Sequence, residues 1–300
     1  MEIVVLDGEL PVTGGDEAPV GGAVLRMLLG SQLRRFREAA GVTSERAGYD
    51  IRASVSKISR METGKVRFKI RDVEDLLSLY GVAGEQERAE ALALARQSAA
   101  PDWWQKYSDI LPGWFETYLG LESAASAIRS FEIQFVPVLF QTEDYARAVT
   151  RLGHKGAPAG EIEDRVAVRL KRQDLLSRPD PPVVWSVMDE AVLRRPAGGA
   201  AVMRAQLRRL VEAAELPHVR FQVVPFRPGG SAGTAGSFSV LRFAEPGLPD
   251  VVYIEQLTSA LYLEQRADVE RYLEVLDQMA GEALTPAASV RFIEQAAREI

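Results

Sequence analysis

The sequence predicts an α+β protein in which a small all-α domain of five helices precedes a larger mixed α/β domain. The chain has 300 residues, 47% of them apolar, which is enough for roughly two domains that each bury a core. From Leu25 to Ala99 the apolar residues recur at helical spacing. Beyond Pro101, helical stretches alternate with short runs typical of strands, so the second domain is expected to contain a sheet.

Changes in composition divide the chain into three expected segments. Residues 1–24 hold the apolar run IVVL and then PVTGGDEAPVGG, whose Pro, Gly and acidic residues predict a flexible N-terminal arm. Residues 25–99 form the predicted all-α domain. SAAPDWWQ then interrupts the helical periodicity, and Pro101 marks a boundary after which residues 100–300 form the larger domain.

The five helices of the first domain follow from apolar spacing and stop signals. LGSQLRRFREAAG places Leu33 and Phe36 on one face and Gly41 at its end, which predicts the first helix. Two short helices are expected from about Ser44 and Ser54, and two longer ones at RDVEDLLSLYG and GEQERAEALALARQS.

The second domain shows both periodicities. Helices are expected at about residues 116–131, 142–152, 161–177, 200–214, 265–281 and 286–298, and strands at FEIQFVPVLF, PVVWSVM, VRFQVVPF, SFSVLRF and DVVYIEQ. Helix 265–281 has one apolar face, which either packs within the domain or pairs across a dimer. We favour packing within the domain; the face consists of Val269, Tyr272, Leu273, Leu276 and Met279.

Composition argues against several kinds of site. Cys is absent and the only two His, His154 and His218, lie far apart, so disulfides, a zinc site and a cofactor are not expected. No run approaches the ~18 apolar residues of a membrane span, and the start, MEIVVLDGELP, has neither a basic leader nor a cleavage site. We therefore expect a cytoplasmic protein without a membrane partner.

Charge is distributed unevenly along the chain. The net charge is −6, which alone would oppose binding to nucleic acid. Residues 31–72, however, hold eleven Lys or Arg and five Asp or Glu, a local charge of +6 that leaves −12 for the rest of the chain. One basic module is therefore attached to a larger acidic body.

The segment VTSERAGYDIRASVSKISRMETGK matches the requirements of a helix-turn-helix. In that motif the second helix lies in the major groove of DNA and is held by apolar contacts to the first. Thr43 or Ser44 can cap the first helix, and Ser54 can cap the second. Ile58 and Met61 point inward, which leaves for the groove Val55, Ser56, Lys57, Ser59 and Arg60.

The end of this segment is suited to phosphate contacts. Gly64 is expected to end the second helix, and Lys65, Arg67 and Lys69 follow on a loop where phosphates would lie. We expect the side chains of Arg60 and Lys57 to reach base edges. An ordinary solvated helix would explain the apolar spacing, but it would not explain the caps, the Gly stop and the local charge together.

Residues 33–82 resemble the helix-turn-helix domain of xenobiotic-response-element (Cro and phage-repressor-like) regulators, which have the lambda-repressor-like fold. Their recognition helix has the form ST-I-S-R-x-E-x-G, which here reads SKISRMETG at residues 56–64. The resemblance implies binding to double-stranded DNA, and a homodimer would supply two such helices. The DNA contacts that the resemblance implies are Ser44, Val55, Ser56, Lys57, Arg60, Thr63 and Lys65. We also expect contacts from Arg52, Ser54 and Lys69.

The sequence departs from this family at two places. Ser44 stands where the first helix usually has Gln, and Arg52 stands in place of the turn Gly within GYDIRAS. The preferred base sequence therefore cannot be copied from better-known relatives.

The second domain is similar to the large C-terminal domain of the WhiJ-like actinobacterial regulators, through DWWQKYSDILPGWFETYLGLESAASAIRSFEIQFVPVLFQTEDYARAV and VVYIEQLTSALYLE. This resemblance implies an antitoxin-like arrangement in which a sensor domain receives a ligand or a small protein encoded nearby. The expected function is therefore sequence-specific transcriptional regulation, of a repressor or developmental type. The alternative is an interaction protein whose main role is to bind that small protein, with DNA binding serving autoregulation.

Other features have simpler explanations. The segment PGGSAGTAG, residues 228–236, lacks the Lys-Ser/Thr ending of a P-loop and is expected to be a hairpin loop. Asp189 and Glu190 can cap a helix, and no partnered base, nucleophile or metal ligand set is visible, so an enzyme is not expected. One aromatic cluster could form a ligand cage or a partner surface. We favour instead an apolar core between the two domains, since large aromatic side chains mostly pack. Its members are Trp103, Trp104, Tyr107, Trp114, Phe115 and Tyr118.

Overall fold

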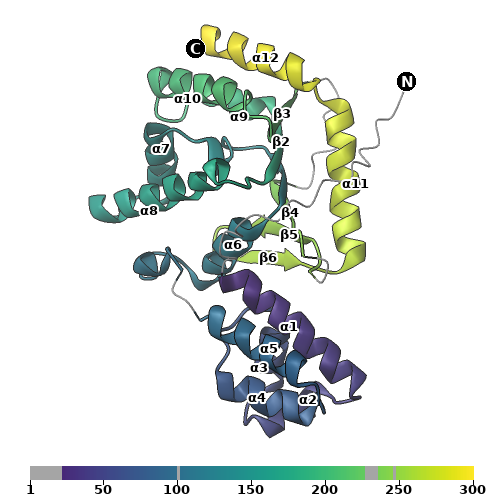
Figure 1. Ribbon diagram of the computed structural model, residues 1–300. Coiled ribbons are helices and arrows are strands. Elements are labelled where there is room, and N and C mark those ends of the chain that lie inside the picture. The colour runs from purple at the N-terminus through teal and green to yellow at the C-terminus, as the bar shows by residue number, and fades with distance from the viewer. Residues whose placement is uncertain (1–21, 100–101, 227–235, 246–247) are drawn as a thin grey trace.

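The computed structural model describes residues 22–99, 102–226, 236–245 and 248–300 of the chain (Figure 1). Residues 1–21 of the expected N-terminal arm lie outside the described residues. The last three residues of that predicted arm are helical, because α1 (Gly22–Ala39) begins at Gly22. The helical domain therefore starts three residues earlier than predicted.

The N-terminal domain contains the five expected helices. After α1 come two short helices, α2 (Ser44–Asp50) and α3 (Val55–Glu62), and then α4 (Ile70–Leu79) and α5 (Glu85–Gln97). Their inward faces share one apolar core whose members include Leu29, Leu33, Ala47, Ile58, Met61, Val73, Leu76, Leu77, Ala91 and Ala95. The helical period read from the sequence thus coincides with the buried faces.

The segment after α3 packs closely on α1 because Gly64 has no side chain. A Cβ atom at Gly64 would lie 2.6 Å from the backbone nitrogen of Met27, and the φ angle of Gly64 is +66°. Both the close approach and the left-handed backbone require glycine. The predicted helix stop at Gly64 is therefore also a packing requirement.

The C-terminal domain is built on one six-stranded mixed sheet. The strands are β1 (Ala127–Glu132), β2 (Val183–Asp189), β3 (Val219–Val224), β4 (Phe238–Arg242), β5 (Val251–Glu255) and β6 (Ala260–Leu263), in the spatial order β3-β2-β1-β4-β5-β6. The first three strands run parallel to one another, and the last three continue the sheet with antiparallel pairs.

Helices cover both faces of this sheet (Figure 1). Helix α11 (Arg266–Glu282) packs on one face through Val269, Leu276 and Met279. The opposite face is covered by α6 (Gly113–Ala124), α7 (Glu143–Gly153), α9 (Glu190–Arg194), α10 (Ala200–Ala213) and α12 (Pro286–Glu299). Because α11 buries its apolar face against its own sheet, the prediction that helix 265–281 packs within the domain is confirmed.

Two predicted boundaries in the second domain were wrong. Residues 116–131 do not form one helix, because α6 ends at Ala124 and β1 begins at Ala127. FEIQFVPVLF is not one strand, because β1 ends at Glu132 and residues 138–140 form a 3-10 helix. Pro137 cannot donate a ladder hydrogen bond, which excludes a continuous strand there. Strand β6 was not predicted. The interpretation of Asp189 and Glu190 as a helix cap is confirmed, because Asp189 caps α9 by accepting from the backbone N–H of Ala191 at 2.8 Å.

The Gly-rich segment at residues 228–236 does not connect a hairpin. Strand β3 lies at one edge of the sheet, whereas β4 pairs with β1 and β5. The two strands flanking the segment are therefore not neighbours, and the hairpin prediction was wrong. All of this segment except Gly236 lies outside the described residues.

The aromatic cluster divides between two environments. Trp103, Trp104 and Tyr107 pack in a small core of the C-terminal domain, together with Leu111 and Val168. The other three members line a large cavity: Trp114, Phe115 and Tyr118. These three residues also pack in or against the buried cluster that contains Met27 of α1. The favoured interpretation as a core joint between the domains therefore holds for the second half of the cluster, whereas the first half packs in a separate core.

The two domains meet through α1 and α6. Met27 of α1 belongs to the same buried cluster as Tyr118 and Leu121 of α6. Beside this contact, the guanidinium of Arg26 lies 3.9 Å from the carboxylate of Asp102. The helix-turn-helix domain is thus packed on the sheet domain through apolar residues and a part-buried ion pair.

Candidate DNA-binding site

Helices α2 and α3 form the predicted helix-turn-helix, and each begins at a side-chain cap. Thr43 caps α2, because its hydroxyl oxygen accepts from the backbone N–H of Arg46 at 3.2 Å. Ser54 caps α3 in the same way, accepting from the N–H of Lys57 at 3.2 Å. Ser44 is therefore the first residue of α2 and not its cap. It is half-buried there.

The two faces of α3 have the predicted difference in exposure. Ile58 and Met61 are each only 1% exposed and fix the helix to the domain core. Val55 is 43% exposed, and Ser56, Ser59 and Arg60 are also exposed. Within the described part of the chain, the guanidinium of Arg60 has no ion pair or hydrogen bond. The guanidinium of Arg60 is therefore free to donate hydrogen bonds to a ligand such as a DNA base.

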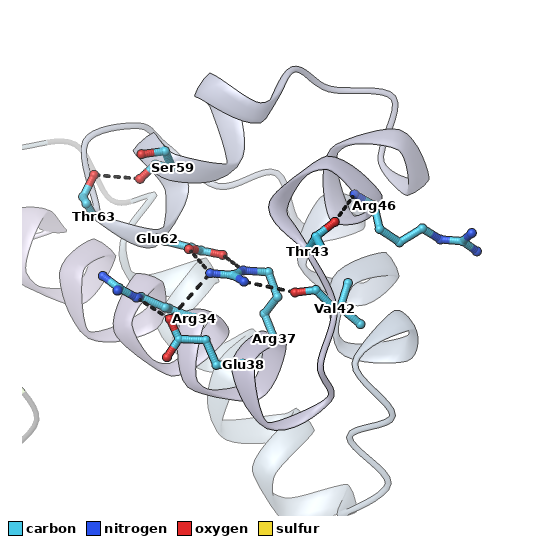
Figure 2. A network of polar contacts seen from close by, with 9 residues as sticks. All are labelled: Arg34, Arg37, Glu38, Val42, Thr43, Arg46, Ser59, Glu62 and Thr63. Carbon is cyan, nitrogen blue, oxygen red and sulfur yellow. Dashed lines mark hydrogen bonds and ion pairs between the residues drawn. The ribbon is translucent and has the colours of Figure 1, made fainter.

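A part-buried ion pair holds α3 against α1 (Figure 2). The guanidinium of Arg37 donates to both carboxylate oxygens of Glu62, at 2.6 and 3.0 Å, and also to the carbonyl of Val42 at 3.0 Å. The side chains of Arg37 and Glu62 are 13% and 9% exposed. A bidentate pair of this kind fixes both distance and orientation, so it sets the angle at which α3 is presented.

Lys57 is placed differently from the prediction that it points into a groove. Its ammonium lies 2.6 Å from the carboxylate of Asp72 on α4, and the Lys57 side chain is 32% exposed. Contact with a base would require this ion pair to open or to be shared. Sequence reasoning missed the pair because Asp72 lies on another helix, 15 residues away.

The loop after α3 faces the C-terminal domain at two positions. The hydroxyl of Thr63 donates to the carbonyl of Ser59 at 2.9 Å, and Thr63 lines a small groove between the domains with Leu248 and Glu264. The ammonium of Lys65 lies 5.8 Å from the centre of the Tyr262 ring. Lys69, in contrast, is exposed at the start of α4. The structure therefore separates these three predicted backbone contacts.

Arg52 occupies a strained position in the turn between α2 and α3. Its φ angle is +53°, the one positive φ at a non-glycine residue within the described ranges. The side chain is exposed. Arg52 therefore adopts the left-handed conformation of the turn Gly that it replaces, although glycine would do so with less steric strain. The substitution also adds a cation beside α3.

Two further exposed residues of α2 were not predicted as contacts. Tyr49 is 80% exposed although it is aromatic, and Arg46 is exposed one turn earlier. Their exposure could have been predicted from the sequence, because the small residues Ala47 and Gly48 make the buried contacts of this helix and leave Arg46 and Tyr49 for its outer face. Among the described residues, no group of three His, Asp or Glu is placed to hold a metal ion.

Two family models match separate ranges of the chain. Residues 28–91 match a family described as a helix-turn-helix domain. Residues 115–295, more than half of the chain, match a family described as a domain of unknown function (DUF5753). The chain belongs to the DUF5753 family. Its N-terminal helix-turn-helix domain is of the kind found in DNA-binding regulators.

The DUF5753 match begins at residue 115 within α6 and ends within α12, so it includes the whole sheet. Comparison with curated proteins and with solved structures finds no match to this chain. None of the described helices is long and apolar enough to span a membrane.

Proposed function

We propose that this protein is a cytoplasmic, sequence-specific transcription regulator, and not an enzyme. It binds double-stranded DNA as a homodimer, with α3 in the major groove and its two copies about 34 Å apart. The observation that carries the proposal is the outer face of α3, where the exposed guanidinium of Arg60 lies beside Ser56 in a region of net charge +6. Arg52 and Lys69 would contact the flanking phosphates.

We further propose that the DUF5753 domain receives a signal, as in the WhiJ-like regulators that its sequence resembles. The signal is a small molecule or a small protein encoded nearby. A large cavity in this domain supports the first form, and the apolar contact between α1 and α6 offers a route to the DNA-binding domain.

An antitoxin-like interaction protein is the second candidate. It is favoured by two apolar side chains on the β5–β6 hairpin, because Leu257 is 95% exposed and Leu261 is 53% exposed. Strand β6 is also an edge strand, which leaves backbone groups available to a partner. In this case the partner would be the main ligand, and DNA binding would serve autoregulation.

Fluorescence anisotropy of the full-length chain tests DNA recognition. The labelled duplex comes from directly upstream of its own gene, and a scrambled duplex is measured beside it at two salt concentrations. Arg60→Ala should lower affinity for the specific duplex by about 10-fold and remove most of the preference over the scrambled one, since one good base contact contributes ~1–3 kcal/mol.

Arg271→Ala is the matched control, because it removes the same charge from an exposed position on α11. It should leave the preference unchanged. If Arg60→Ala discriminates between the duplexes as well as the parent chain does, the assignment of α3 as the recognition helix is wrong. Adding the nearby-encoded protein then separates the two candidates, because a change in DNA affinity is expected of a regulator that receives a signal.

A further inference from the structure

A large cavity opens on the sheet face opposite α11. Its volume is about 1030 Å³, at the upper end of the range for small-molecule sites. The floor is formed by residues of β1, β2 and β5, and the walls by α6, by α8 (Ala159–Arg172) and by the turn before α7. The cavity lies inside the DUF5753 domain, well separated in sequence from α3.

Three arginines of α8 line one wall. Arg165, Arg169 and Arg172 are spaced by four and three residues, so they share one face of the helix. Arg172 is neutralised by Glu122, whose two carboxylate oxygens each lie 2.7 Å from its guanidinium. Arg165 is neutralised by Glu161 at 2.8 Å.

Arg169, between them, has no such partner. Its guanidinium donates to the side-chain oxygen of Gln141 at 3.4 Å, and across the described ranges it forms no ion pair. Burial, reinforced by the charge of Arg172, lowers the pKa of Arg169 to about 10, so the side chain still carries its charge at neutral pH. Arg169 is half-buried in the cavity wall, and a cation partly removed from water is costly unless another charge compensates it.

The acidic groups of the cavity do not compensate Arg169 at close range. Glu122 already pairs with Arg172, and burial raises the pKa of Glu132 to about 8, which keeps most of that carboxyl uncharged at neutral pH. The carboxylate of Glu255 accepts from the hydroxyl of Tyr253 at 2.9 Å and acts on Arg169 only from a distance. The guanidinium of Arg169 therefore lines the cavity without a carboxylate in contact with it among the described residues.

Beside the arginines stands an aromatic wall. Phe115 stacks on Tyr118 with ring centres 5.8 Å apart, and Tyr118 stacks on Tyr253 at 4.0 Å. Trp114 contacts Phe115 edge to face at 5.9 Å. Flat rings of this kind bury large apolar groups at little conformational cost.

We propose that this cavity binds a small organic carboxylate with an aromatic body, its carboxylate paired with Arg169 and its ring against the partly exposed rings of Trp114 and Phe115. A planar carboxylate fits the two parallel N–H donors of a guanidinium, and the aromatic wall covers the rest of the molecule. The assignment deepens the proposed signal-receiving role and rests on it only for the regulatory consequence, since binding itself does not depend on DNA.

Isothermal titration calorimetry of the full-length chain without DNA tests the proposal. The probes are naphthoate and its neutral amide, naphthamide, which differ mainly in charge. The parent chain should bind naphthoate at least about 10-fold more tightly than naphthamide, as expected for a charge-assisted bidentate contact. Arg169→Gln should remove this preference, and Arg169→Lys should restore part of it.

Arg151→Gln is the matched control, because Arg151 is an exposed cation of α7 outside the cavity. It should bind like the parent. Arg169→Gln should melt at the same or a higher temperature without ligand, because it removes a half-buried charge that has no ion-pair partner among the described residues.

Three results would overturn the proposal: equal binding of acid and amide by the parent, an unchanged preference in Arg169→Gln, or no saturable binding of naphthoate. Each is independent of whether the chain recognises DNA, so failure here is distinguishable from failure of the regulator assignment.

Discussion

The ammonium of Lys65, in the loop that follows the recognition helix, lies over the ring of Tyr262 in the sheet domain, 5.8 Å from its centre. The Tyr262 ring is 5.3 Å from that of Tyr253, which stacks on Tyr118 at 4.0 Å. Tyr118 and Tyr253 line the cavity. A series of ring contacts therefore joins the cavity to a cation that was predicted to hold a DNA phosphate.

Replacing Tyr262 tests whether this contact withdraws Lys65 from DNA. Tyr262→Leu removes the ring and should raise DNA affinity by about 2- to 5-fold, since a cation–π contact at an exposed site contributes ~0.5–1 kcal/mol. Tyr262→Phe keeps the ring and serves as the control. Fluorescence anisotropy measures both, and an equal rise in the two variants would argue against the contact. In a Lys65→Ala background the effect of Tyr262→Leu should disappear.

Asp72 holds Lys57 in the folded protein, and releasing it should favour DNA. Asp72→Asn should increase affinity for all duplexes several-fold and steepen the dependence of log K on log salt by about one phosphate contact. Asp75→Asn is the matched control, because it removes the same charge from the same helix but from a pair with Arg71 at 3.8 Å. Equal effects of the two variants, measured by salt-dependent anisotropy, would mean that net charge and not Lys57 is responsible.

Because Arg52 has a left-handed conformation, replacing it with glycine should change the stability of the domain and its DNA affinity in opposite directions. Arg52→Gly should stabilise the helical domain by about 1 kcal/mol, because glycine adopts φ of +53° without steric cost. It should at the same time weaken DNA binding, since a cation beside α3 is lost.

The four Trp residues all lie at or beyond position 103, so Trp fluorescence follows unfolding of the sheet domain alone. Far-UV ellipticity reports the helices of both domains, so a loss of ellipticity that precedes the change in Trp fluorescence follows unfolding of the helical domain. Gly81→Ala is the converse test, because it places a side chain on a residue with φ of +69° and open space around it. This variant should lower the stability of the helical domain. A lower stability of Arg52→Gly would contradict the prediction.

The carboxyl of Glu132 predicts how stability depends on pH. Burial raises the pKa of Glu132 to about 8, above its ordinary value of 4.5, so the folded protein binds more protons than the unfolded chain between these values. Its contribution to stability is therefore fully present below about pH 4.5 and is lost as the pH rises through about 8.

Glu132→Gln should flatten this decline. Thermal melts followed by Trp fluorescence, from about pH 5 to about pH 8, compare the variant with the parent. Glu274→Gln, at an exposed position of α11, is the control and should keep the decline of the parent. An equally steep decline in Glu132→Gln would show that another group is responsible.

Much of the helix-turn-helix could be predicted because its determinants are local. The caps, the apolar positions Ile58 and Met61 and the stop at Gly64 act within one or two turns of the chain, and all lie where they were expected. The boundary at Pro101 stays a prediction, because that residue lies outside the described residues. Strand assignments were less complete, since Pro137 ends a run whose composition is typical of a strand.

The sequence by itself determined where α2 and α3 begin and end, which of their residues are buried, and which segment carries positive charge, because these follow from spacing and from neighbours in the chain. Only the tertiary structure decided which charges meet. Lys57 pairs with Asp72, Arg37 with Glu62 and Arg172 with Glu122, while Arg169 is left alone in a cavity. Electrostatic pairing depends on distance in space, and the partners of these residues come from other helices.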